Sequence, residues 1–423
     1  MSRILTVCFG VLFLTTIIHG RSNDNDDDDD DDDAENKKLE NLINNIATSN
    51  KPIVNNFKPL KAGFIQRGGI GVVFKGERIS DKRPVALKFI KMAKKEDAKR
   101  EYEMYSYLDA IDKPEIEQLG FCSIYYFGEW NEDYMLMAMS LLTDGDLHDK
   151  SNEGFMNYTV ENQVINSLIL FRNFVQQSKY MHSHGIRHDD IKPGNVMFLN
   201  NKSFLIDFNL SSKMLEPIKG TTVKFVSRAY HEGHNLTAID DWESFLYCMC
   251  FSHRIELNWF FSEPFLGLDS EQMNKQYRTL KGQTGGTIAK IEMYITSDPL
   301  RRVFIEFANE VFKKNRLTGF IATTLPDYDR MHRLITAEIE SLVGKYKPAM
   351  FTWLSDPIAV QDALDEFRKG PFDIGKISDP PFDFRYFDYG RQINYTFFED
   401  QEVKPFKNKD KSSHLDCFRN FWK

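Results

Sequence analysis

An eight-residue polar segment, His188-Asp189-Asp190-Ile191-Lys192-Pro193-Gly194-Asn195, most constrains what this chain can fold into. Before it, apolar residues recur at helical spacing from Val164 to Val175, which predicts one face of a long helix ending near His182. After it, residues 196–205 predict a short hairpin, followed by Asp207. The hairpin would bring Asp207 back beside Asn195, so the segment is predicted to be a loop with a carboxylate and an amide side by side.

A glycine-rich stretch lies earlier in the chain, in Ile65-Gln66-Arg67-Gly68-Gly69-Ile70-Gly71-Val72-Val73-Phe74 between two predicted strands. Glycine lets a backbone approach phosphates closely, although a plain glycine-rich hairpin would look the same. The next strand contains Val85-Ala86-Leu87-Lys88, at a spacing where a buried lysine reaches phosphates. The two motifs in this order favour a phosphate site.

A lysine buried in a cleft needs a counter-charge. The following predicted helix offers Glu101, in line with the apolar residues Met104, Tyr105 and Leu108. Glu103 is the competing candidate, but its direction matches that face less well.

Together these motifs resemble the eukaryotic protein kinases, whose H-R-D-x-x-x-x-N pattern residues 188–195 match in everything but the arginine. Four further segments resemble the casein kinase 1 family. Residues 221–227 are similar to its G-T-A-R-Y-A-S activation segment, 240–245 to its D-D-L-E-S-L helix start, 139–142 to its M-E-L-L hinge and 326–328 to its P-D-Y motif.

The resemblance implies an α+β, two-lobed protein kinase fold over residues 57–345. A small lobe of five antiparallel strands and one helix is expected over 57–139, and a larger, mainly helical lobe over 140–345.

Three segments are expected outside this domain. Residues 1–20 are typical of a cleaved signal peptide, since the apolar stretch is too short for a membrane anchor, which is the alternative. Residues 21–56 have the composition of an acidic disordered segment. The aromatic-rich extension 346–423 either packs on the large lobe or binds a partner.

The resemblance also implies a role for each site residue. Asp190 would accept the substrate hydroxyl proton and Lys192 would stabilise the transferring phosphoryl, while Lys88 with Glu101 would position phosphates. Asn195 and Asp207 would hold Mg²⁺, or Mn²⁺. ATP would lie against residues of the loop, third strand, hinge and hairpin: Ile65, Gly68, Gly71, Val73, Ala86, Lys88, Met139, Ser140, Leu142, Met197 and Ile206.

The function expected is an ATP-dependent serine/threonine kinase, monomeric and acting on acidic protein substrates in the secretory pathway or outside the cell. The net charge of −8 comes from nine aspartates within residues 24–33, so the folded body is near neutral and no nucleic-acid partner is expected. After signal cleavage no stable membrane insertion is expected. The five cysteines are too scattered for a disulfide framework and predict mostly buried thiols, with at most one bridge. Five glycosylation sequons occur, at Asn157, Asn201, Asn209, Asn235 and Asn394.

Three positions depart from the kinase pattern. Gln66 replaces the first loop glycine, and Asn209 replaces the glycine after Asp-Phe, where asparagine tolerates a positive φ. Asp189 replaces the arginine that binds a phosphorylated activation segment, so no cation is expected to order that segment, and Asp189→Arg is expected to leave basal activity little changed. These changes keep open the alternative of a secreted pseudokinase, acting as an interaction module or inhibitor.

Overall fold

The computed structural model describes residues 27–49, 51–54, 56–68, 71–153, 160–200, 202–214, 216–261, 263–314 and 325–343. The predicted signal peptide, the C-terminal extension 346–423 and the sequons at Asn157, Asn201 and Asn394 lie outside the described residues.

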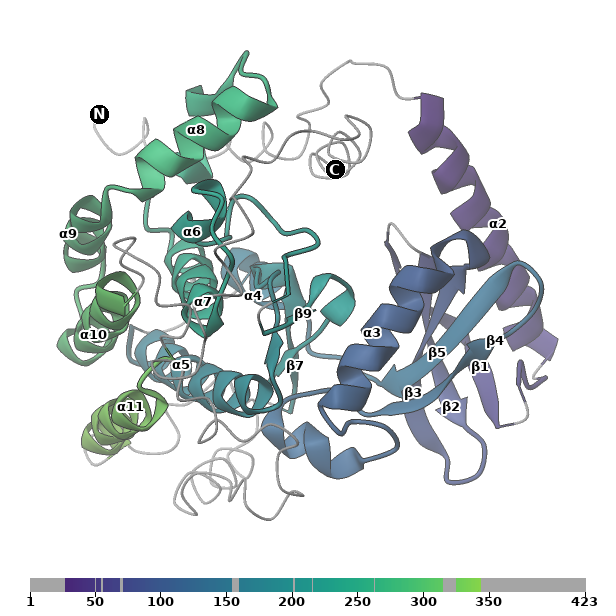
Figure 1. Cartoon of the computed structure of the whole chain (residues 1–423). Helices are drawn as coiled ribbons and strands as arrows, with labels where there is room; N and C mark the ends of the chain where they lie inside the picture. Colours follow the sequence, from purple (N-terminus) through teal and green to yellow (C-terminus); the bar gives the residue numbers. More distant parts are fainter. Residues whose placement is uncertain are drawn as a thin grey trace, which may run out of the picture.

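Five antiparallel strands and one helix form the small lobe, as predicted. The strands are β1 (Phe57–Gly68), β2 (Gly71–Arg78), β3 (Arg83–Lys91), β4 (Ile124–Glu129) and β5 (Tyr134–Ser140), in the order β1-β2-β3-β5-β4. Helix α3 (Lys95–Tyr107) lies on one side of this sheet (Figure 1). Alternation along β3 divides the faces: Val85, Leu87 and Phe89 belong to an apolar cluster on one side, whereas Ala86 and Lys88 face the other.

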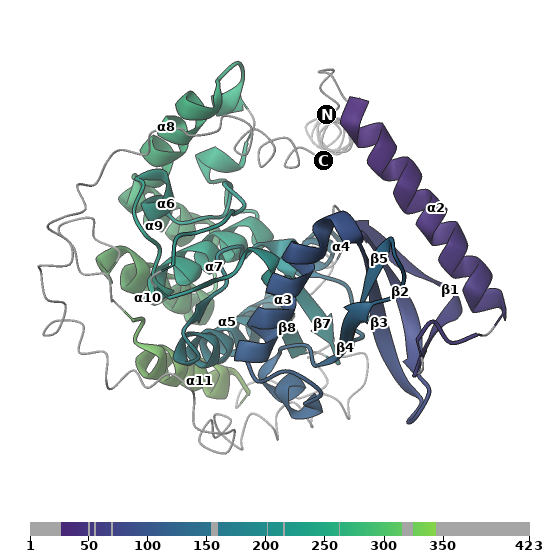
Figure 2. The ribbon, with the colours of Figure 1, turned by 45° about the vertical axis from the view of Figure 1, so that its right-hand side comes forward.

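A second helix, α2 (Asp27–Ser49), covers the opposite face of the sheet, so the prediction of disorder over residues 21–56 is wrong for this part of the chain (Figure 1, Figure 2). Leu39 and Ile43 follow one another at helical spacing, and both are buried in the apolar cluster of that face. Ala47 continues the same stripe. The prediction of disorder gave more weight to the acidic composition of the segment than to these three apolar residues, which pack the helix against the sheet.

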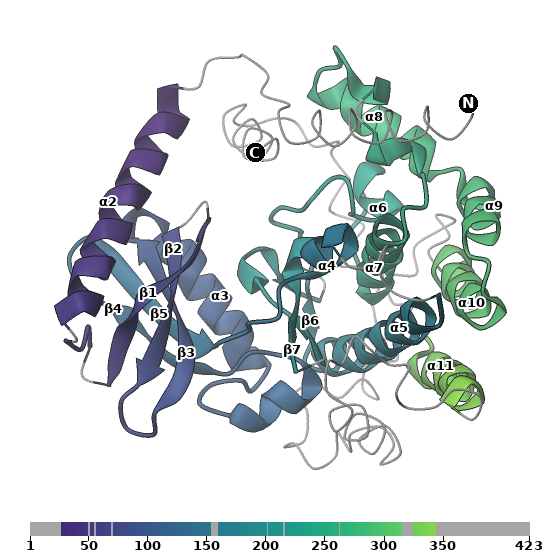
Figure 3. The ribbon, with the colours of Figure 1, turned by 180° about the vertical axis from the view of Figure 1, so that it is seen from behind.

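Helices and short hairpins make up the large lobe, which is seen from behind in Figure 3. The long helix α5 (Val160–Ser183) and helix α7 (Ala238–Ser252) pack at its centre. Aromatic rings pack these helices together: Phe174 of α5 stacks on Phe245 of α7 at 3.8 Å between centroids, and Trp242 of α7 stacks at 4.5 Å on Phe307 of the helix Asp298–Lys314. The other helices are α4 (Leu147–Glu153), α6 (Arg228–His231), α8 (Ser270–Lys281), α9 (Thr284–Tyr294), α10 (Asp298–Lys314) and α11 (Tyr328–Val343).

The large lobe also contains two small two-stranded sheets. Strands β7 (Val196–Leu199) and β8 (Lys202–Leu205) form the predicted hairpin, and β6 (Ile186–Arg187) pairs with β9 (Ser212–Lys213). Short 3₁₀ turns connect the larger elements: Met92–Lys94, Pro114–Leu119, Pro193–Asn195, Phe208–Leu210, Asn258–Phe260 and Glu263–Phe265.

Two predictions about side chains and helices can be compared with the described residues. Cys122, Cys248 and Cys250 are buried free thiols, as expected. None of the described helices combines the length and apolar character needed to cross a membrane.

The docking of α2 predicts a stability difference between neighbouring residues. Ile43→Ala should lower the free energy of unfolding by about 2–5 kcal/mol, because it removes a fully buried side chain from the sheet face. Leu42→Ala is the matched control, since Leu42 is 42% exposed, and should change the free energy by less than about 0.5 kcal/mol. Denaturant unfolding of the full chain measures both, and equal effects at the two positions would contradict the docked helix.

Candidate active site

A buried ion pair joins the sheet to helix α3 at the predicted phosphate site. Lys88 Nζ lies 2.7 Å from Glu101 Oε2 and 3.9 Å from Asp207 Oδ1. Burial opposes the charge on both partners, but the two carboxylates outweigh it and raise the pKa of Lys88. Burial also raises the pKa of Glu101, and the Lys88 ammonium counteracts this. The 2.7 Å contact thus favours the charged form of both partners. Glu103, the competing candidate, is exposed.

Asp190 is buried in the catalytic loop and is held by side chains from two segments. Its Oδ2 accepts hydrogen bonds from Lys192 Nζ at 2.8 Å and from Asn195 Nδ2 at 3.2 Å. Its Oδ1 accepts from the backbone N–H and the hydroxyl of Thr222. A carboxylate can accept about four hydrogen bonds, and these four donors occupy those positions. Thr222 of the activation segment therefore binds the same carboxylate as Lys192 and Asn195 of the loop.

Asn195 and Asp207 carry oxygen donors of the kind that Mg²⁺ takes from proteins. The amide nitrogen of Asn195 donates to Asp190 O and Oδ2, which leaves the amide oxygen to act as a ligand. Asp207 has φ 66°, a left-handed conformation, and its side chain is 31% exposed beside Lys88. Carboxylate and amide oxygens are the ligands that Mg²⁺ takes from proteins, so these donors fit the ion.

The loop backbone is fixed from helix α7. Asp241 is buried and accepts hydrogen bonds from the backbone N–H groups of His188 at 2.9 Å and Asp189 at 3.0 Å. His182 Nε2 lies 2.9 Å from the same carboxylate, and its Nδ1 lies 2.6 Å from the Tyr328 hydroxyl at the start of α11. A chain of polar contacts thus links α11, α5 and α7 to the catalytic loop.

Four rings pack between helix α3 and the loop. Phe208, directly after Asp207, contacts Tyr105 of α3 at 5.1 Å, His188 of the loop at 4.7 Å and Phe121 at 6.1 Å between centroids. This packing fixes the position of the Asp207 backbone relative to the helix that carries Glu101. The Lys88–Glu101 ion pair and Asp207 are therefore part of one packed unit.

The strand register shows which of the predicted nucleotide contacts lie on the same sheet face as Lys88. Ala86 pairs with Met139 and Lys88 with Met137, so Met139 lies on the same sheet face as the lysine. Val73 pairs with Lys88 and shares that face.

The side chain of Ser140 lies on the sheet face opposite to Lys88. It pairs with Val85 on the outer face, and its hydroxyl donates to Glu117 Oε1 at 2.6 Å. The side chain ties the hinge to the 3₁₀ turn Pro114–Leu119 instead. Only the backbone of Ser140 remains available to a nucleotide.

The other residues predicted to contact the nucleotide differ in their burial. Leu142 is buried after the hinge, Met197 and Ile206 are half-buried at the β7–β8 hairpin, and Ile65 is half-buried on β1. Gly68 pairs with Gly71 at the end of the β1–β2 hairpin. A Cβ on Gly71 would lie 1.8 Å from Phe89 O, so this glycine is required for close packing against β3 in addition to any role at phosphates.

The turn after Phe208 shows why Asn209 is tolerated, and the reason differs from the one predicted. The left-handed residue is Asp207, whereas Asn209 lies inside the 3₁₀ turn Phe208–Leu210 and has a negative φ. Aspartate is among the residues that adopt left-handed conformations most readily. The turn therefore does not require a glycine after Phe208.

The structure also contradicts the expectation that no cation orders the activation segment. Arg187 is fully buried and binds Asp189 through two parallel hydrogen bonds, Nε to Oδ1 at 2.9 Å and Nη2 to Oδ2 at 3.1 Å. The expected tolerance of Asp189→Arg is therefore wrong, because that change would place two guanidinium groups together in a buried site. Arg187 was missed because it stands outside the aligned motif; an arginine two residues before an aspartate was the available signal.

Lys281 of α8 is a second residue that the motifs did not reveal. Its Nζ is buried and donates to the carbonyl oxygens of Val223 at 2.8 Å and Val226 at 2.6 Å. Burial lowers the pKa of this lysine well below its ordinary value. The residues after Thr222 are thereby fixed to a distant helix, which no local sequence pattern indicates.

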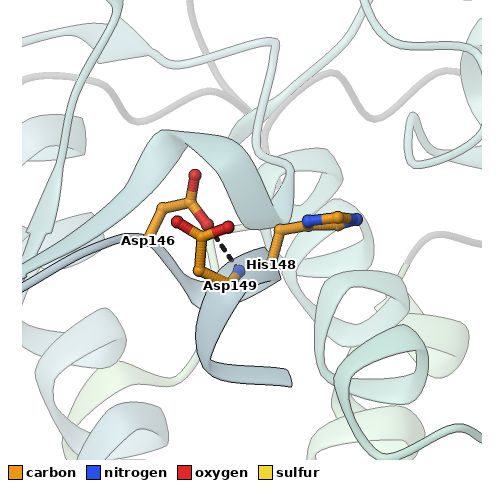
Figure 4. Close-up of side chains that lie close together, drawn as sticks. All are labelled: Asp146, His148 and Asp149. Atoms are coloured by element: carbon orange, nitrogen blue, oxygen red, sulfur yellow. Dashed lines mark hydrogen bonds between the residues drawn. The ribbon is translucent and has the colours of Figure 1, made fainter. Parts of the chain in front are cut away.

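An acidic group at the start of α4 lies near the catalytic loop. Asp146, His148 and Asp149 have potential ligand atoms within 4.8 Å of one another (Figure 4). Asp146 Oδ1 accepts from the backbone N–H of Asp149 at 2.8 Å, which is the contact of a helix N-cap. Capping of α4 accounts for Asp146 without a metal ion.

Comparison with known proteins agrees with this geometry. The family model described as protein kinase domain matches residues 61–234. A probable casein kinase I homolog of Encephalitozoon cuniculi is 26% identical over 51% of this chain and 71% of its own length. A casein kinase I homolog of Kluyveromyces lactis is 25% identical over 69% of this chain, and the match spans only 52% of that relative.

Two other similarities extend to a virus and to a solved structure. A probable serine/threonine-protein kinase of fowlpox virus is 27% identical over 45% of this chain and 71% of its own length. The structure of vaccinia related kinase 3 aligns with a TM-score of 0.46 and 13% identity, covering 73% of this chain and 96% of that one. The family model and the casein kinase I homologues support a resemblance of this chain to the eukaryotic protein kinases and, at 25–26% identity, to the casein kinase 1 family.

Proposed function

We propose that this protein is an active kinase that transfers the γ-phosphoryl of ATP to serine and threonine hydroxyls of proteins. The observation that carries the proposal is the position of Asp190, with Lys192 and Asn195 on one carboxylate oxygen and Thr222 on the other. Two further contacts support the proposal: Lys88 lies 3.9 Å from Asp207, and Asn195 lies 3.2 Å from Asp190. Catalysis by such a site comes from positioning and electrostatics.

The hydrogen bonds of Asp190 indicate how a substrate hydroxyl would enter. The carboxylate already accepts about as many hydrogen bonds as it can, so an incoming hydroxyl must replace one donor. Lys192 is the donor free to leave, because its side chain is 33% exposed, whereas Asn195 and Thr222 are buried. We expect Lys192 to move toward the transferring phosphoryl group when the hydroxyl binds Asp190.

Lys88 would bind phosphate oxygens from the other side of the cleft, held in place by Glu101. Magnesium bound by Asn195 and Asp207 would supply charge neutralisation for the phosphates. The adenine ring of ATP would lie between the sheet face that carries Lys88 and the hinge, in contact with Val73, Ala86, Met139 and Leu142.

We also propose that the chain acts in the secretory pathway or outside the cell. The support is the apolar N-terminal stretch and the sequons. Among the described sequons, Asn235 is exposed, while Asn209 lies inside the active-site turn. The preference for acidic substrates and the monomeric state stay predictions, and casein is a suitable acidic probe.

Asp190→Asn should lower kcat for casein phosphorylation by about 10²- to 10⁴-fold, because the amide cannot accept the hydroxyl proton. Nucleotide binding should persist, since Lys88 and Asp207 are unchanged. Asp207→Ala should abolish Mg²⁺-dependent nucleotide binding as well. Radiolabel transfer and calorimetric titration with MgATP separate the two effects. If both variants phosphorylated casein at the parent rate, the phosphate transfer would not depend on this site. That result would refute the active kinase and favour the pseudokinase.

Export predicts that the purified chain begins near Arg21 and carries N-linked glycans. Asn201, in the segment joining β7 to β8, and the exposed Asn235 are the expected sites. Intact mass and a gel shift on glycosidase treatment check this, with Asn235→Gln as the comparison. An intact Met1 with no shift would contradict export.

A further inference from the structure

Arg187 connects three segments that meet beside the catalytic loop. Two of its nitrogens bind the Asp189 carboxylate, Nη1 donates to Leu236 O at 2.6 Å, and Nη2 also donates to Glu216 O at 2.9 Å. Leu236 lies just before α7, and Glu216 lies in the activation segment that runs from Asp207 toward Ser227. Every guanidinium nitrogen is therefore used inside the protein.

The backbone around Asp189 is built to keep this contact. Asp189 has φ 63°, a left-handed conformation that aspartate tolerates, and its N–H is bound by Asp241. It immediately precedes Asp190, so a shift of this residue would displace the base. A non-glycine residue keeps a left-handed conformation only where surrounding contacts hold it. Here Arg187 binds the Asp189 side chain and Asp241 binds its backbone N–H.

The contact fixes the activation segment at a second point. Strand β9 pairs with β6, which contains Arg187, and Met214 N–H donates to Gly185 O at 2.7 Å. Glu216 is then bound by Arg187, and six residues later Thr222 binds Asp190. The segment is held on both sides of residues 217–221 by contacts within the chain.

In kinases regulated on this segment, a phosphorylated residue pairs with a cation and orders the loop. Here Asp189 has already neutralised Arg187 in a buried site, and the geometry leaves Arg187 no free nitrogen for a phosphate. We propose that Arg187 is a positioning residue whose ion pair with Asp189 and hydrogen bond to Glu216 order the activation segment in place of a phosphate. This inference rests on the proposed kinase function for its catalytic consequence.

A double-mutant cycle tests the pair. Arg187→Met or Asp189→Asn alone leaves the other partner incompletely compensated in a buried site, and each should lower kcat/KM for casein by about 10- to 100-fold through misplacement of the segment. The KM for ATP should stay close to that of the parent. The variant with both substitutions should be less impaired in stability than Arg187→Met, because no unpaired charge remains.

A matched control and a second readout separate positioning from general stability. Arg301→Met removes an arginine from a surface pair with Asp298 and should change neither activity nor melting temperature. Lys219 is exposed within the segment and gives trypsin a cleavage site. Cleavage after Lys219 should be slow in the parent and the control, and several-fold faster in Arg187→Met, measured at a temperature where all remain folded.

Phosphatase treatment completes the test. The parent should keep its activity after treatment, and a loss of activity would overturn the inference. Parent-like kcat/KM and trypsin resistance in Arg187→Met would also overturn it. If the parent transfers no phosphate at all, the proposed function fails, while protection of Lys219 that depends on Arg187 would still support the ordering role.

Discussion

The active site depends above all on the carboxylate of Asp241. It is buried at the start of α7 and accepts from the His188 and Asp189 backbone and from His182. Burial disfavours its charge, yet these contacts, led by the hydrogen bond from His182, lower the pKa of Asp241. The aromatic packing of α5, α7 and α10 thus determines where Asp190 lies. The position of the base is a property of the helical core, although the base itself lies on a loop.

The small lobe is fixed to the same frame through Phe208. Its ring touches Tyr105 on the helix that carries Glu101 and His188 on the catalytic loop. The same ring packing therefore positions both Glu101, which lies 2.7 Å from Lys88, and Asp207, which directly precedes Phe208. Three departures from the kinase pattern leave this unit intact: Gln66 lies in the loop hairpin, Asn209 within a 3₁₀ turn and Asp189 in an internal ion pair. None of them removes a residue that would touch ATP, metal or substrate.

Sequence motifs predicted the parts of the structure that depend on local spacing. The glycine loop, Lys88, Glu101, Asp190 and Asp207 follow one another in the order and spacing of the kinase motifs. This order indicated the two lobes, because each motif predicts the strand, helix or loop on which it lies. Helix α2 was missed because three apolar residues were outweighed by an acidic composition. The direction of Ser140 follows from strand register, and the partner of Asp189 follows from a left-handed backbone. The register is not visible in residue spacing, and the spacing of Arg187 and Asp189 indicates a pair only once the left-handed backbone between them is known.

The central claim is that this divergent site transfers phosphate, and the most direct measurement is radiolabel transfer from γ-labelled ATP to casein by the purified chain. We predict Mg²⁺-dependent incorporation into serine and threonine without prior activation of the protein. Binding of MgATP with no incorporation into casein, or into any other protein acceptor tried, would contradict the account and identify the chain as a nucleotide-binding pseudokinase.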